Sequence, residues 1–241
     1  MKYTFEQVIK SIPAEKRKMD SQVTFLFIRP FSFFITYFVV NLGISAWFVS
    51  LVSAITVFTG CMLVCIDSNV TRWIGIVLII LWAVLDCVDG NTARVTKTQS
   101  NKGAFMDAES GYFTCAFLYF SYGMAAFHTS DGRIVSNLVM LVFFGAFASL
   151  SDILSRLIYQ KYVSVAENSN NNAGSTPQPS PINKIRKRIS TELGITGLAP
   201  IGGIIAQAFV CYDFLVLFYF FFCSMTLLFT SVYYSLKAHQ S

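Results

Sequence analysis

The strongest constraint on this sequence is its alternation of long apolar blocks with short polar breaks. Of the 241 residues, 54% are hydrophobic and only 13% are charged, whereas an ordinary soluble domain carries about 25% charged residues. A helix needs about 20 mostly apolar residues to cross a bilayer. Lipid admits only helices and closed barrels, and these blocks lack the alternating pattern of barrel strands. The sequence therefore predicts an all-α integral membrane protein.

We predict six transmembrane helices, which together form one membrane domain over residues 44–241. Their approximate ranges are Ile44–Ile66, Trp73–Val88, Gly103–Phe127, Ile134–Tyr162, Ile195–Val210 and Phe214–Leu236. The second and fifth ranges are short, so we expect these helices to extend into their polar flanks.

The N-terminal segment, residues 1–43, contains the apolar stretch Val23–Leu42, which Arg29-Pro30 interrupts. Proline breaks the hydrogen-bond ladder of a helix, and arginine is costly in the middle of a bilayer. The remainder, Phe31–Leu42, has about 12 residues and is too short to span. We therefore predict an N-terminal helix that lies in the membrane interface.

Basic residues indicate the orientation of the chain. With both termini inside, the segments on the opposite side hold only Arg72 and Arg133. The positive-inside rule therefore places both termini in the cytoplasm. Residues 167–181, between the fourth and fifth spans, are rich in Asn, Ser and Pro, and we expect a disordered cytoplasmic loop there.

A basic run follows this loop and consists of Lys184, Arg186, Lys187 and Arg188. Such a run favours contact with anionic lipid headgroups, but its cations could also hold a phosphate group of a substrate. Arg156 is the better candidate for that second role, because it lies within the fourth predicted span, where topology does not explain a positive charge.

Three carboxylates lie where the second predicted span ends and the third begins. Asp86 and Asp89 are three residues apart and share a helical face, and Asp107 lies at the start of the next span. Such hard oxygen ligands suit magnesium or manganese better than zinc. The alternative is a set of interfacial acids paired with nearby lysines and arginines. The grouping of the three carboxylates with small residues favours a metal site.

Small residues lie on the same helical faces as these aspartates. Gly90 and Ala93 follow the first two aspartates, and Gly103 lies four residues before Asp107. Their near lack of side chains lets a ligand approach the backbone closely. Arg94 adds a planar cation suited to phosphate.

The segment resembles the signature of the CDP-alcohol phosphotransferase family, D-x2-D-G-x2-A-R-x8-G-x3-D-x3-D. The residues that match, with every spacing kept, are Asp86, Asp89, Gly90, Ala93, Arg94, Gly103 and Asp107. The last family aspartate is missing, and Gly111 occupies its position. In the family, that aspartate is a metal ligand and the general base for the acceptor hydroxyl. Where the family often has a Pro-Asn-x-x-Thr stretch, only Ser50 preserves a hydroxyl.

The resemblance implies an enzyme of phospholipid biosynthesis that passes a phosphoryl-alcohol group from a CDP-linked donor, such as CDP-diacylglycerol, to an acceptor hydroxyl and releases CMP. It implies that Asp86, Asp89 and Asp107 bind magnesium or manganese, with Asp107 also catalytic. The nucleotide would contact Gly90, Ala93, Arg94 and Gly103, with Ser100 as a weaker polar contact. The acceptor, an alcohol or a phosphorylated alcohol, would be held by Arg156 or by the basic run Lys184–Arg188.

The resemblance also implies a homodimer surrounded by membrane lipids, and we expect the inner membrane of a bacterium and no nucleic-acid partner. Gly111 leaves three alternatives open. The enzyme uses another base, the chain is an impaired relative that only binds nucleotide, or the glycine is an engineered change. A remote alternative is a cation-coupled transporter, which would need matching glycine breaks in both halves, and only Gly202-Gly203 provides one.

Overall fold

A computed structural model describes residues 2–132, 134–170 and 181–239, and this part of the chain is helical and contains no strand. The helices are α1 (Phe5–Lys10), α2 (Ala14–Met19), the π-helix η1 (Thr24–Ile28), α3 (Arg29–Asn41), α4 (Ala46–Val64), α5 (Asn69–Thr96), α6 (Asn101–Thr129), α7 (Val139–Asn170), α8 (Pro181–Leu193), α9 (Leu198–Phe209) and α10 (Tyr212–His239). The prediction of an all-α fold is confirmed.

Within the described residues, six helical runs are long and apolar enough to cross a membrane. They are Thr24–Asn41, Ala46–Val64, Asn69–Thr96, Val139–Val165, Ile185–Phe209 and Tyr212–Lys237. The protein is therefore an integral membrane protein, as predicted. The set differs from the predicted one at two places, because it includes the run that ends at Asn41 and omits α6.

The predicted interruption at Arg29-Pro30 is wrong. The π-helix η1 continues directly into α3, so one helix runs from Thr24 to Asn41. The wide turns of η1 accommodate Pro30, whose ring and missing N–H would disrupt an ordinary α-turn. Arg29 does not face lipid, because its guanidinium is bound to the carboxylate of Asp20 at 2.7 and 2.8 Å.

Helix α6 corresponds to the third predicted span but is less apolar than the six runs. It has 29 residues, which corresponds to about 44 Å at 1.5 Å per residue. Its polar side chains Ser110, Thr114 and Ser121 are fully buried, because α6 contacts α4, α7 and α10. A helix enclosed by other helices does not need an apolar surface on every side.

The other boundaries differ from the prediction mainly in length. Helix α5 extends into both polar flanks of the second predicted span, as expected. The fifth predicted span corresponds to α9, which α8 precedes. Helix α7 continues through Asn170, into the stretch predicted as a disordered loop, while residues 171–180 of that loop lie outside the described residues.

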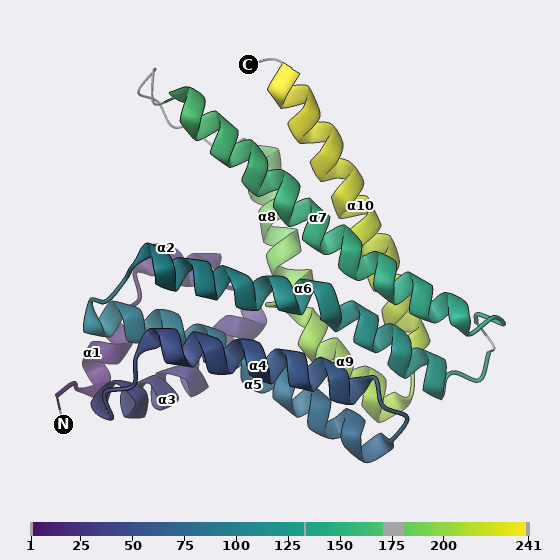
Figure 1. Cartoon of the computed structure of the whole chain (residues 1–241), viewed down its shortest axis with the longest axis horizontal. Helices are drawn as coiled ribbons and strands as arrows, with labels where there is room; N and C mark the ends of the chain where they lie inside the picture. Colours follow the sequence, from purple (N-terminus) through teal and green to yellow (C-terminus); the bar gives the residue numbers. More distant parts are fainter. Residues whose placement is uncertain (1, 133, 171–180, 240–241) are drawn as a thin grey trace.

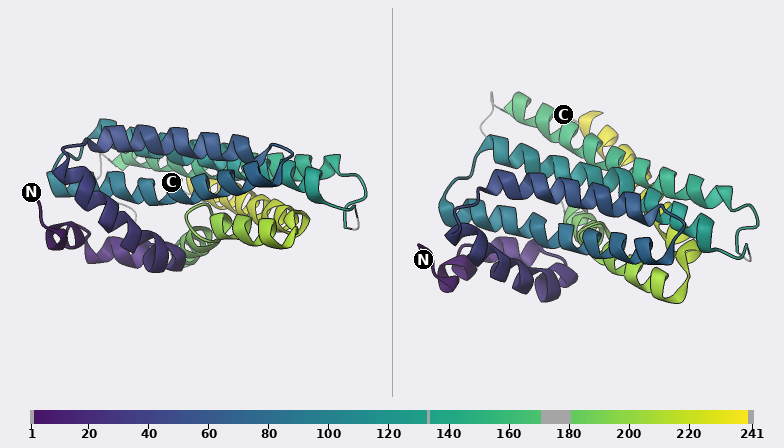
Figure 2. Two further views of the ribbon diagram at one scale, coloured as in Figure 1. Left: turned by 90° about the horizontal axis from the view of Figure 1, so that it is seen from below. Right: turned by 60° about the horizontal axis from the view of Figure 1, so that its bottom comes forward.

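Helices α4, α5 and α6 run side by side. Helices α7 and α10 lie together, and their C-terminal ends diverge from the other three helices (Figure 1). The N-terminal helices lie at the end of the bundle where α5 ends and α6 begins (Figure 2). Contacts of α3 and α1 with α5 hold them there. This arrangement places the N-terminal segment beside the predicted site residues.

Two glycines bring the backbones of α4 and α5 close together. A Cβ atom added at Gly75 would lie 2.6 Å from the carbonyl oxygen of Gly60, and one added at Gly60 would lie 2.9 Å from that of Gly75. Such approaches allow the close van der Waals packing that holds helices together in a membrane.

We expect Gly75→Ala to force α4 and α5 apart and to destabilise the protein by about 1–3 kcal/mol. Thermal unfolding in detergent measures the change. The matched control is Gly111→Ala, because a Cβ at Gly111 meets no atom within 4 Å. This control should keep or slightly raise stability, since alanine favours a helix by about 1 kcal/mol over glycine. Equal unfolding temperatures for the two variants would contradict the close crossing.

Candidate active site

The residues predicted for the metal and the nucleotide line one cavity of about 940 Å³. It lies between the last turns of α5 and the first turns of α6, beneath the N-terminal segment. The residues are Asp86, Asp89, Gly90, Ala93, Arg94, Ser100, Gly103 and Asp107. Their roles stay a prediction, but the fold brings all of them to the same place.

A short turn between the two helices sets this geometry. Helix α5 ends at Thr96, and Lys97 adopts a left-handed conformation with φ of 56° that reverses the chain. Ser100 then caps α6 by accepting a hydrogen bond from the backbone N–H of Gly103 at 3.2 Å. The turn therefore directs Asp107 toward the cavity that the end of α5 lines.

Asp89 is the most enclosed of the three carboxylates, with 3% of its surface exposed. Its Oδ2 accepts a hydrogen bond from the Ser50 hydroxyl at 2.6 Å. Its Oδ1 is buried and has no hydrogen-bond partner among the described residues. A buried carboxylate oxygen without a partner is costly, so this atom is suited to bind a cation.

The three carboxylates also repel one another, because the charges of Asp107 and Asp89 act on Asp86. As the side chains lie, no three His, Cys, Asp or Glu residues in the described part of the chain converge closely enough to hold a metal ion. Magnesium is usually bound by one or two carboxylates, and water and substrate phosphates complete its coordination. The oxygen-only ligands and the unpartnered Asp89 oxygen fit such an ion.

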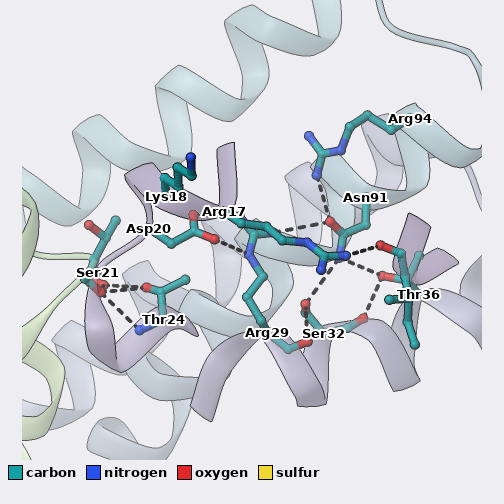
Figure 3. A network of polar contacts seen from close by, with 12 residues as sticks. Arg17, Lys18, Asp20, Ser21, Thr24, Arg29, Ser32, Thr36, Asn91 and Arg94 are labelled. Carbon is teal, nitrogen blue, oxygen red and sulfur yellow. Dashed lines mark hydrogen bonds and ion pairs between the residues drawn. The ribbon is translucent and has the colours of Figure 1, made fainter. Parts of the chain in front are cut away.

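A buried network joins the N-terminal segment to α5 and orients Arg94 (Figure 3). Asn91 accepts hydrogen bonds through Oδ1 from Arg94 at 2.7 Å and from Arg29 at 3.3 Å. Arg29 also binds both carboxylate oxygens of Asp20. The direction of the Arg94 guanidinium therefore depends on residues far away in the sequence.

Asn91 is a residue that the sequence analysis missed. It is fully buried, and its amide donates hydrogen bonds to the hydroxyls of Ser32 at 3.2 Å and Thr36 at 3.4 Å. Its position between Gly90 and Arg94 was a signal, since a polar amide on a helix that faces other helices must find buried partners.

Lys16 was also missed, because the sequence analysis counted it only as a charge that sets orientation. It lines the cavity of about 940 Å³, as do Arg29 and Arg94. Desolvation and the neighbouring positive charges of Arg94 and Arg29 lower the pKa of Lys16 below its ordinary value. Lys16 and Arg94 line the same cavity as the three aspartates, an arrangement suited to a phosphate-bearing ligand with its metal.

A smaller cavity of about 350 Å³ adjoins the larger one at Asp86 and Asp107, which line both. Gly111 and Arg156 face this second cavity from α6 and α7. The fold therefore brings Arg156 next to the position of the missing aspartate. The open space at Gly111 would accept a side chain.

The arginines of the basic run in α8 donate hydrogen bonds to other segments of the chain. Arg186 donates to the hydroxyls of Thr230 at 2.7 Å and Tyr234 at 3.3 Å, and Arg188 donates at 3.1 Å to the backbone carbonyls of Lys18 and Asp20. Neither they nor Lys187 line either cavity. The side chain of Lys184 lies outside the described part.

We expect Asp20→Ala to destabilise the protein by about 3–5 kcal/mol, because it leaves Arg29 buried without its carboxylate. The side chains of Arg29 and Asp20 are only 6% and 10% exposed. The matched control is Glu6→Ala, which breaks a pair with Lys10 whose side chains are 74–75% exposed and should cost below about 0.5 kcal/mol. Thermal unfolding compares the two, and similar losses would contradict the role of the buried pair.

The fold and the site together define a helical integral membrane protein with acidic and basic residues around a cavity at the ends of two helices. The family model of CDP-alcohol phosphatidyltransferases matches residues 34–170, which include α4–α7 and both aspartate-bearing helix ends. The chain belongs to the CDP-alcohol phosphatidyltransferase family, as the resemblance predicted. No curated protein matches it.

Membership gives the general reaction, transfer of a phosphatidyl group from a CDP-alcohol to an alcohol acceptor within a membrane. The family generally uses divalent metals. The match begins at residue 34, so Lys16, Asp20 and Arg29 precede it.

Proposed function

We propose that this protein transfers a phosphatidyl-type group from a CDP-linked lipid such as CDP-diacylglycerol to an acceptor hydroxyl, in phospholipid biosynthesis, and releases CMP. The observation that carries the proposal is that Asp86, Asp89, Asp107 and Arg94 line one cavity. Carboxylates for a metal and a guanidinium for phosphate are the groups that a diphosphate donor needs.

The donor would bind in the larger cavity. Asp86, Asp89 and Asp107 would hold magnesium or manganese, which would neutralise the diphosphate and the departing CMP. Gly90, Ala93 and Gly103 leave room for the nucleotide against both helices, and Ser100 lines the same wall. Arg94 would donate to phosphate oxygens in the direction that Asn91 fixes.

The acceptor would bind in the smaller cavity, beside Arg156 and Gly111. Its hydroxyl oxygen would attack the phosphorus that carries the lipid alcohol. The bond from that phosphorus to the oxygen of CMP would break, and the hydroxyl proton would pass to a base. Asp107 is our candidate for a weaker substitute base, because it lines both cavities but would also hold the metal. A positioned base contributes about 100- to 10,000-fold to the rate, so the absence of a carboxylate at position 111 should make this enzyme slow.

For the topology, we propose six spans and cytoplasmic termini in a bacterial inner membrane. Both ends of the run Thr24–Asn41 contribute to the larger cavity, through Thr24 and Asn41. A helix that crossed the bilayer would place its ends on opposite faces. This arrangement supports an interfacial position for the run, with α6 as the remaining span. The expected homodimer stays a prediction.

The transporter alternative has no support from α9. That helix is continuous from Leu198 to Phe209, through Gly202 and Gly203. A discontinuous helix at that point is what a midplane ion site would require.

We expect the purified protein to release CMP from CDP-diacylglycerol only with magnesium or manganese and an acceptor alcohol. Asp86→Asn, Asp89→Asn and Asp107→Asn should each lower the rate at least about 100-fold, and Gly111→Asp should raise it by up to the 100- to 10,000-fold attributed to a base. Gly111→Ala is the control that adds a side chain without a carboxylate, and it should not show this increase. Chromatographic detection of CMP measures all five variants.

Donor binding without CMP release would identify a nucleotide-binding relative. If neither the parent protein nor Gly111→Asp releases CMP or binds the donor, the proposed function is wrong.

A further inference from the structure

The smaller cavity contains a charge pair that bears on the kind of acceptor it can hold. Arg156 Nε lies 3.5 Å from Asp152 Oδ1, one helical turn earlier on α7. The Asp152 side chain is 12% exposed and the Arg156 side chain is 38% exposed. A carboxylate buried in a membrane helix needs a cation beside it, and Arg156 provides it. Asp152 therefore offsets the positive charge that Arg156 brings to the cavity.

The other charges around this cavity are negative. Among the described residues that line it, Asp86 and Asp107 are the only charged ones besides Arg156. Behind the wall, the guanidinium of Arg186 lies 5.9 Å from the ring centre of Tyr159, but Thr230 and Tyr234 already accept its hydrogen bonds. A phosphate monoester carries about 1.5–2 negative charges at neutral pH. Asp152 offsets the charge of Arg156, and no other cation among the described lining residues balances that negative charge.

An amino alcohol lacks a partner there as well. Its ammonium group would need a free carboxylate away from the metal site. The Oδ2 atom of Asp152 has no hydrogen-bond partner among the described residues, but it is buried below the surface. Position 111, where a carboxylate would face the cavity, is glycine.

Uncharged polar groups, in contrast, are present on the wall. The Tyr112 hydroxyl donates a hydrogen bond to Gln160 Oε1 across α6 and α7, and Tyr159 and Thr196 also face the cavity. Hydroxyl and amide groups both donate and accept hydrogen bonds. They suit a ligand that carries several hydroxyls of its own.

We propose that the acceptor is an uncharged polyhydroxy alcohol, and that Asp152 is a positioning residue that sets this preference by neutralising Arg156. The inference rests on the proposed function and narrows its substrate class. The oxygen of one polyol hydroxyl forms the new bond to phosphorus while the bond to the CMP oxygen breaks, and the hydroxyl proton passes to the base. The remaining hydroxyls bind the wall. No further reactant is needed.

The test compares matched acceptors by CMP release in the parent protein. Gly111→Asp is used only for the pairs of uncharged and phosphorylated alcohols, because its new carboxylate would itself hold an ammonium group. The pairs are glycerol against glycerol 3-phosphate and myo-inositol against inositol phosphate, with ethanolamine and serine as amino alcohols. We expect kcat/KM for the uncharged polyols to exceed that of the charged alcohols at least about tenfold. A preference for a phosphorylated or amino alcohol would overturn the inference and leave the proposed function intact.

Asp152→Asn should shift the preference toward phosphorylated acceptors at least about tenfold, mainly through KM, because it frees the charge of Arg156. The ratio between two acceptors is measured on one sample, so a partial loss of folded protein does not affect it. The matched control is Asp213→Asn, which changes a similarly buried carboxylate that lines neither cavity. An unchanged ratio in Asp152→Asn, or an equal shift in the control, would overturn the role of Asp152.

If no acceptor supports CMP release, a measurement of donor binding distinguishes two explanations. If CDP-diacylglycerol still binds with magnesium, the chain is the nucleotide-binding relative described above, so the acceptor inference is wrong and only the donor site stands. If the donor does not bind, the proposed function itself is wrong.

Discussion

The Asn91 amide is the junction on which the shape of the larger cavity depends. Its oxygen is shared by the guanidinium groups of Arg29 and Arg94, while its nitrogen binds hydroxyls on α3. Buried polar groups of this kind are costly when any partner is missing. The network therefore fixes the N-terminal segment over the end of α5, and the same contacts that hold this segment orient Arg94, which we propose binds the donor.

The proposed chemistry follows from where the two cavities meet. Asp86 and Asp107 lie at their boundary, so a donor diphosphate on one side and an acceptor hydroxyl on the other would share the same carboxylates. Positioning of this kind is the main contribution a protein makes to phosphoryl transfer. In the proposed reaction, the charge pair on α7 would influence which alcohols bind on the acceptor side, and the glycine at position 111 would slow the loss of their proton.

The sequence was sufficient to predict the helical class, five of the six runs that could cross a membrane, and the residues around the larger cavity, because apolar length and fixed spacing are local properties. The predicted break at Pro30 is wrong, because the π-helix before this proline lets the helix continue. The sequence also did not explain the polar face of α6, which is buried against other helices. Asn91, Lys16 and Asp152 were missed because their partners lie on other helices or a turn away on a buried face. Contacts of that kind become visible only once the chain is folded.

The central claim is that Asp86, Asp89 and Asp107 bind a divalent metal whose coordination the donor diphosphate completes. Binding of manganese, followed by electron paramagnetic resonance with and without CDP-diacylglycerol, tests it most directly. The account predicts that the donor tightens manganese binding at least about tenfold, that Asp86→Asn abolishes this gain, and that Gly111→Ala retains it. Manganese binding that ignores the donor, or that persists unchanged in Asp86→Asn, would contradict the account.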